Sequence, residues 1–175
     1  VRPVVDNLNK INDSYKENNR LNFHINLILV PCPNANGTEY KVAKSWNKFE
    51  LITKAEIIRK LLIKPYKYAK WPQKGIVIFL GGDQLWSVLL AKRLGYLNIT
   101  YAEWISRWPR WNNIIAAMNL KVSKSIPKRY RYKCKVIGDL MADITNNEEV
   151  SLNLEDGKWI ALLPGSKKAK LSVAI

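Results

Sequence analysis

The chain has 175 residues, enough for one globular domain with room for part of another. Its 29 Lys and Arg against 14 Asp and Glu give a formal net charge of +15, which favours an anionic partner such as nucleic acid, acidic lipid or a phosphorylated substrate. A composition rich in Lys, Asn and Ile explains the same excess without any partner. One histidine and two distant cysteines exclude zinc-site spacing and a disulfide framework, and favour a reducing, intracellular setting.

The first third of the chain alternates between helical and strand patterns. Apolar residues at helical spacing predict a helix over residues 3–18, and the apolar run 24–31 predicts a strand. We expect the lone histidine, His24, to be structural. Residues 32–47 indicate a polar loop, and residues 49–63 a basic amphipathic helix. Residues 64–74 alternate basic and aromatic side chains, which is typical of a connecting loop, a lipid interface or a single-stranded RNA site.

Residues 74–95 predict a strand, a tight turn and a helix, and the rest of the fold is organised around them. Residues 76–80 are an unbroken apolar run, which predicts a strand buried on both faces. Gly81 and Gly82 permit a sharp turn, and Asp83 stands where a helix N-cap would. Ligands of open α/β sheets collect at the carboxyl ends of such strands, so this turn is the first candidate site.

The next strand, residues 97–102, leads into a segment rich in tryptophan and arginine. Trp104, Arg107, Trp108, Arg110 and Trp111 fall within eight residues. Arginine pairs with phosphate or carboxylate, and tryptophan packs on sugar rings or acyl chains. The alternative is that one or two of the tryptophans fill core beneath the sheet edge.

The remaining patterns are short. They predict a helix over 111–118, a weak strand over 119–123, a basic turn or short helix over 126–133, and a strand over 135–138. Residues 146–156 are acidic and indicate a linker, followed by a strand over 158–163. The alternation predicts an α/β, Rossmann-like fold, with a mainly parallel sheet and helices on both faces. We expect the chain to be a fragment that lacks its first strand.

Three segments resemble the lipid-A-disaccharide synthase family and its cyanobacterial-type relatives. They are IVIFLGGDQLWSVLLAKRLG at residues 76–95, KVIGDLMAD at 135–143 and IALLPGSKKAKL at 160–171. The resemblance implies a GT-B glycosyltransferase with an N-terminal acceptor-type domain over 1–144, a linker over 145–157 and the start of a truncated C-terminal domain over 158–175. The family's Gly-rich N-terminal motif is absent, and Lys167 replaces the family's arginine, which removes a bidentate phosphate contact.

The resemblance also implies a function and a site. A sugar would pass from a UDP-sugar to a lipid-linked or acylated sugar acceptor, without a cofactor or metal. The protein would be cytoplasmic, and peripheral attachment at the inner membrane stays open. Asp83 would be the catalytic base. Gly165, Ser166 and Lys167 would bind the donor; the acceptor or an anionic lipid surface would meet Gly81, Gly82, Trp104, Arg107, Arg110 and Trp111.

Besides a nucleotide-sugar epimerase of the same architecture, against which the single histidine argues, two other function classes stay open. One is a non-catalytic relative that keeps the fold, for which the lysine at position 167 is the argument. The other is a basic module that binds RNA or an anionic surface through residues 64–74 and 126–133. Neither segment carries an RNA-binding motif, so we expect no specific nucleic-acid partner.

Overall fold

The computed structural model describes residues 1–17, 23–33, 35 and 37–142. By its internal contacts the chain divides into Val1–Ile144 and Thr145–Ile175, and all described residues belong to the first unit. The expected linker, the expected second domain and the candidate donor residues Gly165, Ser166 and Lys167 lie outside the described residues.

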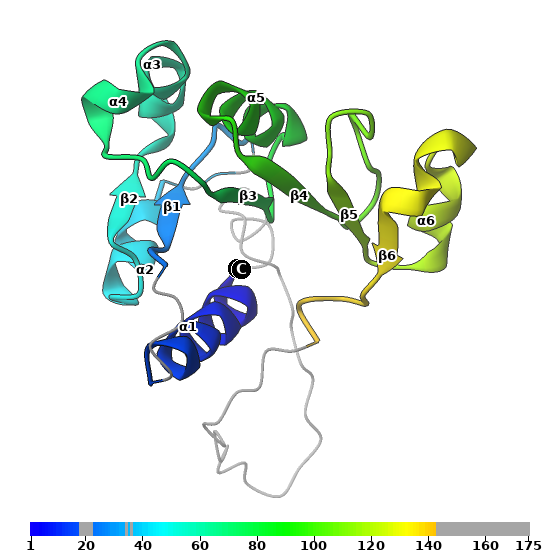
Figure 1. Ribbon diagram of the computed structural model, residues 1–175, viewed down its shortest axis with the longest axis horizontal. Coiled ribbons are helices and arrows are strands. Elements are labelled where there is room, and N and C mark those ends of the chain that lie inside the picture. Colours follow the sequence, from blue (N-terminus) through cyan, green and yellow to red (C-terminus); the bar gives the residue numbers. More distant parts are fainter. Residues whose placement is uncertain (18–22, 34, 36, 143–175) are drawn as a thin grey trace, which may run out of the picture. The chain divides into compact units, whose positions relative to one another are not determined.

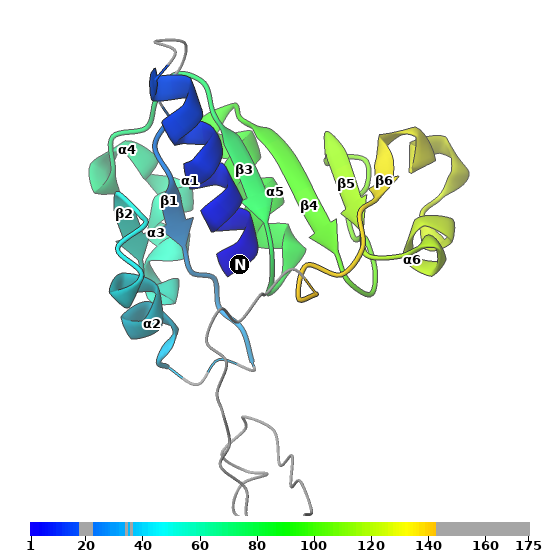
Figure 2. The same ribbon diagram turned by 90° about the horizontal axis from the view of Figure 1, so that it is seen from below.

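Every strand pairing in the described part of the chain is parallel. Strands β1 (Asn26–Ile28) and β2 (Leu51–Thr53) pair in one sheet. A second sheet has the order β3 (Ile76–Phe79), β4 (Leu97–Ala102), β5 (Ile114–Ala117) and β6 (Cys134–Val136). Helix α1 (Arg2–Glu17) lies on one side of the strands and α5 (Gln84–Leu94) on the other (Figures 1 and 2). The predicted Rossmann-like α/β class is therefore confirmed.

The central strand–turn–helix prediction is confirmed, although the strand is less buried than predicted. Asp83 caps α5 by accepting a hydrogen bond from the Leu85 backbone N–H at 3.0 Å, and Gly95 ends the helix in the left-handed conformation at φ +71°. The prediction that β3 is buried on both faces is wrong, because Ile76 and Ile78 are 55% and 37% exposed. Helix α5 packs on one face of this strand and leaves the other face partly open.

The core lies between the sheet and its helices on the α5 side. A buried apolar cluster spans β4, β5 and helix α6 (Leu120–Ser125), together with the residue that ends α6. Its members are Ala102, Ile115, Ala117, Val122 and Ile126. The same side of the sheet also buries polar groups. The Asn112 Oδ1 accepts hydrogen bonds from Asn98 Nδ2 at 2.6 Å and Thr100 Oγ1 at 3.0 Å, which satisfies buried donors at a low-dielectric site.

Between β1 and β3 three predictions need correction. The helix expected over residues 49–63 is wrong at its start, because Leu51–Thr53 pairs with β1 as strand β2. Only Ala55–Ile57 (η1, a 3-10 turn) and Ile58–Ile63 (α3) are helical there. The expected loops contain two short helices, α2 (Glu39–Ser45) and α4 (Pro65–Tyr68). The strand conformation of residues 51–53 depends on pairing with β1, which is far away in the sequence. The local periodicity of these residues carries no sign of that partner.

After β4 the structure has a strand where a helix is predicted, and a helix where the next strand is predicted. The helix expected over residues 111–118 is wrong, because Ile114–Ala117 pairs with both neighbours as β5. The strand expected over 119–123 is also wrong, because Leu120–Ser125 is helix α6, capped by the Asn119 Oδ1 that accepts from the Val122 N–H at 3.0 Å. The 3-10 helix η2 (Lys128–Lys133) and strand β6 agree with the predicted basic turn or short helix and the strand after it.

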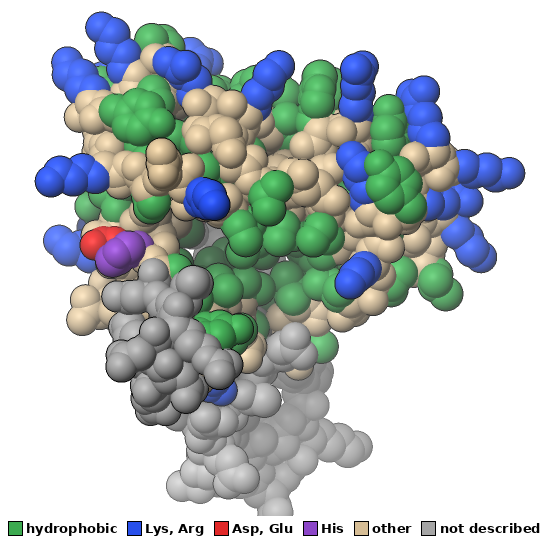
Figure 3. Space-filling model, in the orientation of Figure 1, with side chains coloured by type: hydrophobic (Ala, Val, Ile, Leu, Met, Phe, Trp, Pro, Cys, Tyr) green, Lys and Arg blue, Asp and Glu red, His purple; other side chains and the backbone are tan. Residues whose placement is uncertain are grey.

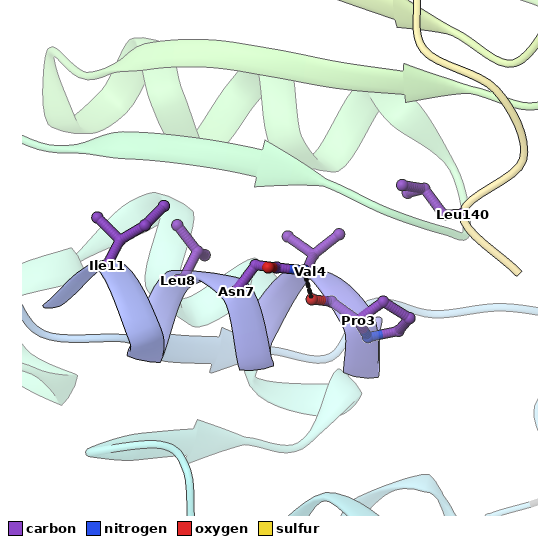
Figure 4. Close-up of a pocket in the computed structure, with 6 residues that line it drawn as sticks. All are labelled: Pro3, Val4, Asn7, Leu8, Ile11 and Leu140. Carbon is purple, nitrogen blue, oxygen red and sulfur yellow. Dashed lines mark hydrogen bonds between the residues drawn. The ribbon is translucent and has the colours of Figure 1, made fainter. Parts of the chain in front are cut away.

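The α1 side of the sheet is apolar and incompletely covered. Lys and Arg side chains are abundant over the opposite side, which carries α5 (Figure 3). On the α1 side, Leu97 and Ile114 are 54% and 41% exposed. A cavity of about 220 Å³ remains between α1 and the segment after β6. Figure 4 shows its lining side chains, which are Pro3, Val4, Asn7, Leu8, Ile11 and Leu140.

Candidate active site at the carboxyl edge of the sheet

Gly81, Gly82 and Asp83 form the turn that leaves the carboxyl end of β3. Gly82 has φ +96°, a conformation that side chains rarely adopt. A Cβ on this residue would also lie 2.6 Å from Val30 Cγ2, so the turn is packed against Val30, two residues after the end of β1. This close approach explains why glycine is needed and fixes the position of the next residue, Asp83.

The Asp83 side chain lies on an open edge of the domain. It is exposed, and one carboxylate oxygen accepts the capping bond from Leu85. Asp83 lines neither of two cavities found among the described residues. The second, of about 310 Å³, is lined by His24, Asn26, Glu50, Lys70, Trp71 and Pro72. There the His24 Nδ1 lies 2.9 Å from the Glu50 Oε2, an exposed pair away from the candidate base.

Gln84 connects the Asp83 turn to the segment that follows β4. Its side chain is buried, its Nε2 donates to the Ile105 carbonyl at 2.7 Å, and its Oε1 accepts from the Arg107 N–H at 2.6 Å. Both ends of the amide are therefore used to hold a neighbouring loop. Sequence reasoning missed this residue, because a glutamine in the first turn of a helix is more often a solvent-exposed side chain.

The first half of the β4–β5 connection lies at the same edge as Asp83. Trp104 follows β4 almost directly and is 82% exposed, and Ile105 beside it is 53% exposed. Arg107 is exposed, with its backbone held by Gln84. Asp83, Trp104 and Arg107 are thus brought to one edge by two adjacent strands, and the two strand ends are linked by Gln84.

The second half of this connection runs back toward the amino ends of the strands. The Asn113 N–H donates to the Asn98 carbonyl at 2.9 Å, next to the first residue of β4. Arg110 and Trp111 precede Asn113 and belong to this second half of the connection. The Trp108 and Trp111 rings stack with centroids 5.3 Å apart.

None of the three tryptophans fills core. Trp108 and Trp111 are 40% and 48% exposed, and Trp104 more so. The expectation that one or two would be buried beneath the sheet edge is wrong. The residues that take this space are polar: Asn112 is 1% exposed and bonds to Asn98 and Thr100.

Lys133 is a second residue that the sequence did not single out. Its Nζ donates to the carbonyl oxygens of Arg110 at 3.1 Å and Asn112 at 2.8 Å, and lies 3.5 Å from that of Pro109. One ammonium group therefore holds the second half of the β4–β5 connection against η2. In the sequence this lysine is one of several in a basic run, and the spacing carries no sign of its role.

Metal and membrane-spanning features are absent from the described ranges. No group of three or more His, Cys, Asp or Glu side chains there could hold a metal ion. No helix of the described residues has the length and apolar character to cross a bilayer. Comparison with protein families, curated proteins and solved structures gives no match to the chain.

Proposed function

We propose that the domain is the acceptor-binding part of a sugar transferase, which moves a sugar from a UDP-sugar to a lipid-linked or acylated sugar acceptor. The observation that supports it best is the pair of hydrogen bonds made by the Gln84 side chain, one donated to the Ile105 carbonyl and one accepted from the Arg107 N–H. They hold Trp104 and Arg107 at the edge where Asp83 follows β3. A carboxylate, an exposed indole and a guanidinium at the carboxyl edge of a parallel sheet suit an anionic sugar ligand.

In this proposal each side chain has a separate task. Asp83 accepts the proton of the acceptor hydroxyl as that oxygen attacks the sugar carbon and UDP leaves, a contribution of about 10²–10⁴-fold for a positioned base. Trp104 packs on the acceptor ring, and Arg107 pairs with its phosphate or carboxylate. The resemblance implies that the donor is held mainly by the second domain, through residues outside those described.

The experiment separates the two roles that Asp83 can have. Asparagine caps a helix about as well as aspartate but is not a base, so Asp83→Asn tests catalysis while keeping the cap. In the natural full-length protein, we expect Asp83→Asn to lower sugar transfer by at least about 100-fold with an unchanged melting temperature. Asp83→Ala should lose both activity and about 0.5–2 kcal/mol of stability.

Transfer is measured with a panel of UDP-sugars and an acylated amino-sugar phosphate as acceptor. A UDP-sugar that raises the melting temperature of the full-length protein identifies the donor. Activity that survives Asp83→Asn would reduce Asp83 to a helix cap. A protein that binds no UDP-sugar and transfers none would instead be a non-catalytic relative that keeps the fold.

A further inference from the structure

We propose that the cavity near the amino ends of β1 and β3 binds a small zwitterion, namely an α-amino acid with an apolar side chain. This cavity has a volume of about 310 Å³ and is lined by His24, Asn26, Glu50, Lys70, Trp71 and Pro72. Pro72 precedes β3 and Asp83 follows it, so the cavity is separate from the candidate active site. The inference goes beyond the proposed function, because it holds whether or not Asp83 is catalytic.

The histidine side of the cavity is held in place by α1 and by the pairing of β1 with β2. The Asn12 side chain on α1 bonds to both the carbonyl and the N–H of Phe23, at 2.9 and 3.0 Å, and so fixes the residue before His24. The Glu50 N–H donates to the Ile25 carbonyl at 3.0 Å, which sets Glu50 beside His24. Both side chains are therefore positioned before a ligand binds, and this lowers the entropic cost of binding.

The other side of the cavity offers an apolar surface. The Trp71 Nε1 donates to the Pro65 carbonyl at 3.0 Å, which turns the polar edge of the indole toward α4. The Tyr96 hydroxyl donates to the Pro72 carbonyl and holds the residue after the tryptophan. The carbon atoms of the indole and the Pro72 ring are thus available to an apolar group of a ligand.

Both signs of charge line the cavity, and each keeps unused bonding capacity. The His24 Nδ1 lies 2.9 Å from Glu50 Oε2, and the other oxygen of this carboxylate accepts no hydrogen bond from a further described residue. Among the described residues Lys70 makes no ion pair or hydrogen bond. The Asn26 Oδ1 is buried without a partner in the same part of the chain. A turn of this amide toward the cavity would give its oxygen a ligand N–H.

This combination of charges favours a zwitterion over a ligand of one sign. A phosphate at Lys70 would be repelled by the Glu50 carboxylate, and a simple amine at Glu50 by the Lys70 ammonium. An α-amino acid carries both partners, because its ammonium can donate to Glu50 while its carboxylate pairs with Lys70. Its apolar side chain then packs on Trp71 and Pro72. The volume suits this class, since small-molecule sites begin at about 300 Å³.

The test uses His24 as a reporter, because it is the only histidine of the sequence and its imidazole gives a single set of NMR signals. Leucine is the probe. Leucinamide, which lacks the carboxylate, and isocaproate, which lacks the ammonium, are matched analogues. We expect leucine to shift the His24 signals saturably, and each analogue to bind at least about tenfold more weakly, the loss typical of one charge-assisted bond.

Two variants with matched controls tie this binding to the cavity. Lys70→Met should weaken leucine binding at least about tenfold and leave leucinamide binding unchanged, because only the carboxylate of leucine meets Lys70. Lys67→Met, at an exposed position of α4 outside the cavity, should change neither. Glu50→Gln should weaken leucine binding but not isocaproate binding, and Glu56→Gln on η1 is its control.

Three results would overturn the proposal. The first is the absence of any His24 shift at about 10 mM leucine, which is above the usual range of affinities for small substrates. The second is equal affinity for leucine and isocaproate, which would mean that the cavity binds apolar groups alone. The third is equal weakening by Lys67→Met and Lys70→Met, which would show a diffuse effect of charge.

Discussion

The Tyr96 ring packs against Gly75 and links the residues before β3 to those before β4. This contact requires that residue 75 have no side chain. A Cβ on Gly75 would overlap the Tyr96 ring, and the Tyr96 hydroxyl donates to the Pro72 carbonyl. Burial, and secondarily the Tyr66 hydroxyl, raise the pKa of Tyr96 above its ordinary value. The ring thus joins the residues before β3 to those before β4.

Gly75→Ala should lower the free energy of unfolding by about 1–3 kcal/mol, because the ring must move aside. Gly81→Ala is the matched control, since a Cβ there would meet no atom within 4 Å. Denaturant unfolding of both variants checks this. In a Tyr96→Ala background the cost of Gly75→Ala should largely disappear; a cost that persists would place its origin in the backbone and not in the ring.

At the scale of elements, prediction from sequence succeeded where the signals were local. The Asp83 cap, the Gly95 stop and the apolar run of β3 all lie within the segment they define, and these elements were found. Residues 51–53 and 114–117 were mistaken for helix, because their strand character depends on partners such as Asn26 and Ile99.

The candidate site was predictable only in part, for a related reason. Asp83 and Trp104 follow strands, so their shared edge could be deduced from the parallel topology. The roles of Gln84 and Lys133 could not, because each acts on the backbone of another segment more than 20 residues away. Such contacts are set by tertiary packing and leave no spacing pattern in the sequence.

The β4–β5 connection contains no helix, and Lys133 holds its second half through the carbonyls of Arg110 and Asn112. Lys133→Met keeps the length of the side chain but removes the ammonium donor, and should cost about 1–3 kcal/mol of unfolding free energy. Lys128→Met on the same element should cost less than about 0.5 kcal/mol. Hydrogen exchange of the backbone amides of residues 107–113 measures the local effect. Unchanged protection in Lys133→Met would mean that the loop is held by its own contacts.

At the scale of the whole domain, the two faces of the four-stranded sheet are unequal. Ile115 on the α5 side is fully buried, whereas Leu97 on the α1 side is 54% exposed. Ile115→Ala should therefore cost about 2–5 kcal/mol, and Leu97→Ala less than about 1 kcal/mol. Thermal unfolding of the two variants tests this difference. Equal costs would show that the α1 side of the sheet is covered in solution.

The order of the strands has a consequence for how the chain acquires its fold during synthesis. In the larger sheet each strand pairs with the one made just before it, as in Ile76 with Leu97, Ile99 with Ile114, and Ile115 with Cys134. Every new strand thus finds its partner already outside the ribosome, some 15 to 21 residues upstream. Short loop closures of this kind favour rapid folding. The sheet can grow strand by strand from β3, because β4, β5 and β6 each pair with a strand that was translated before them.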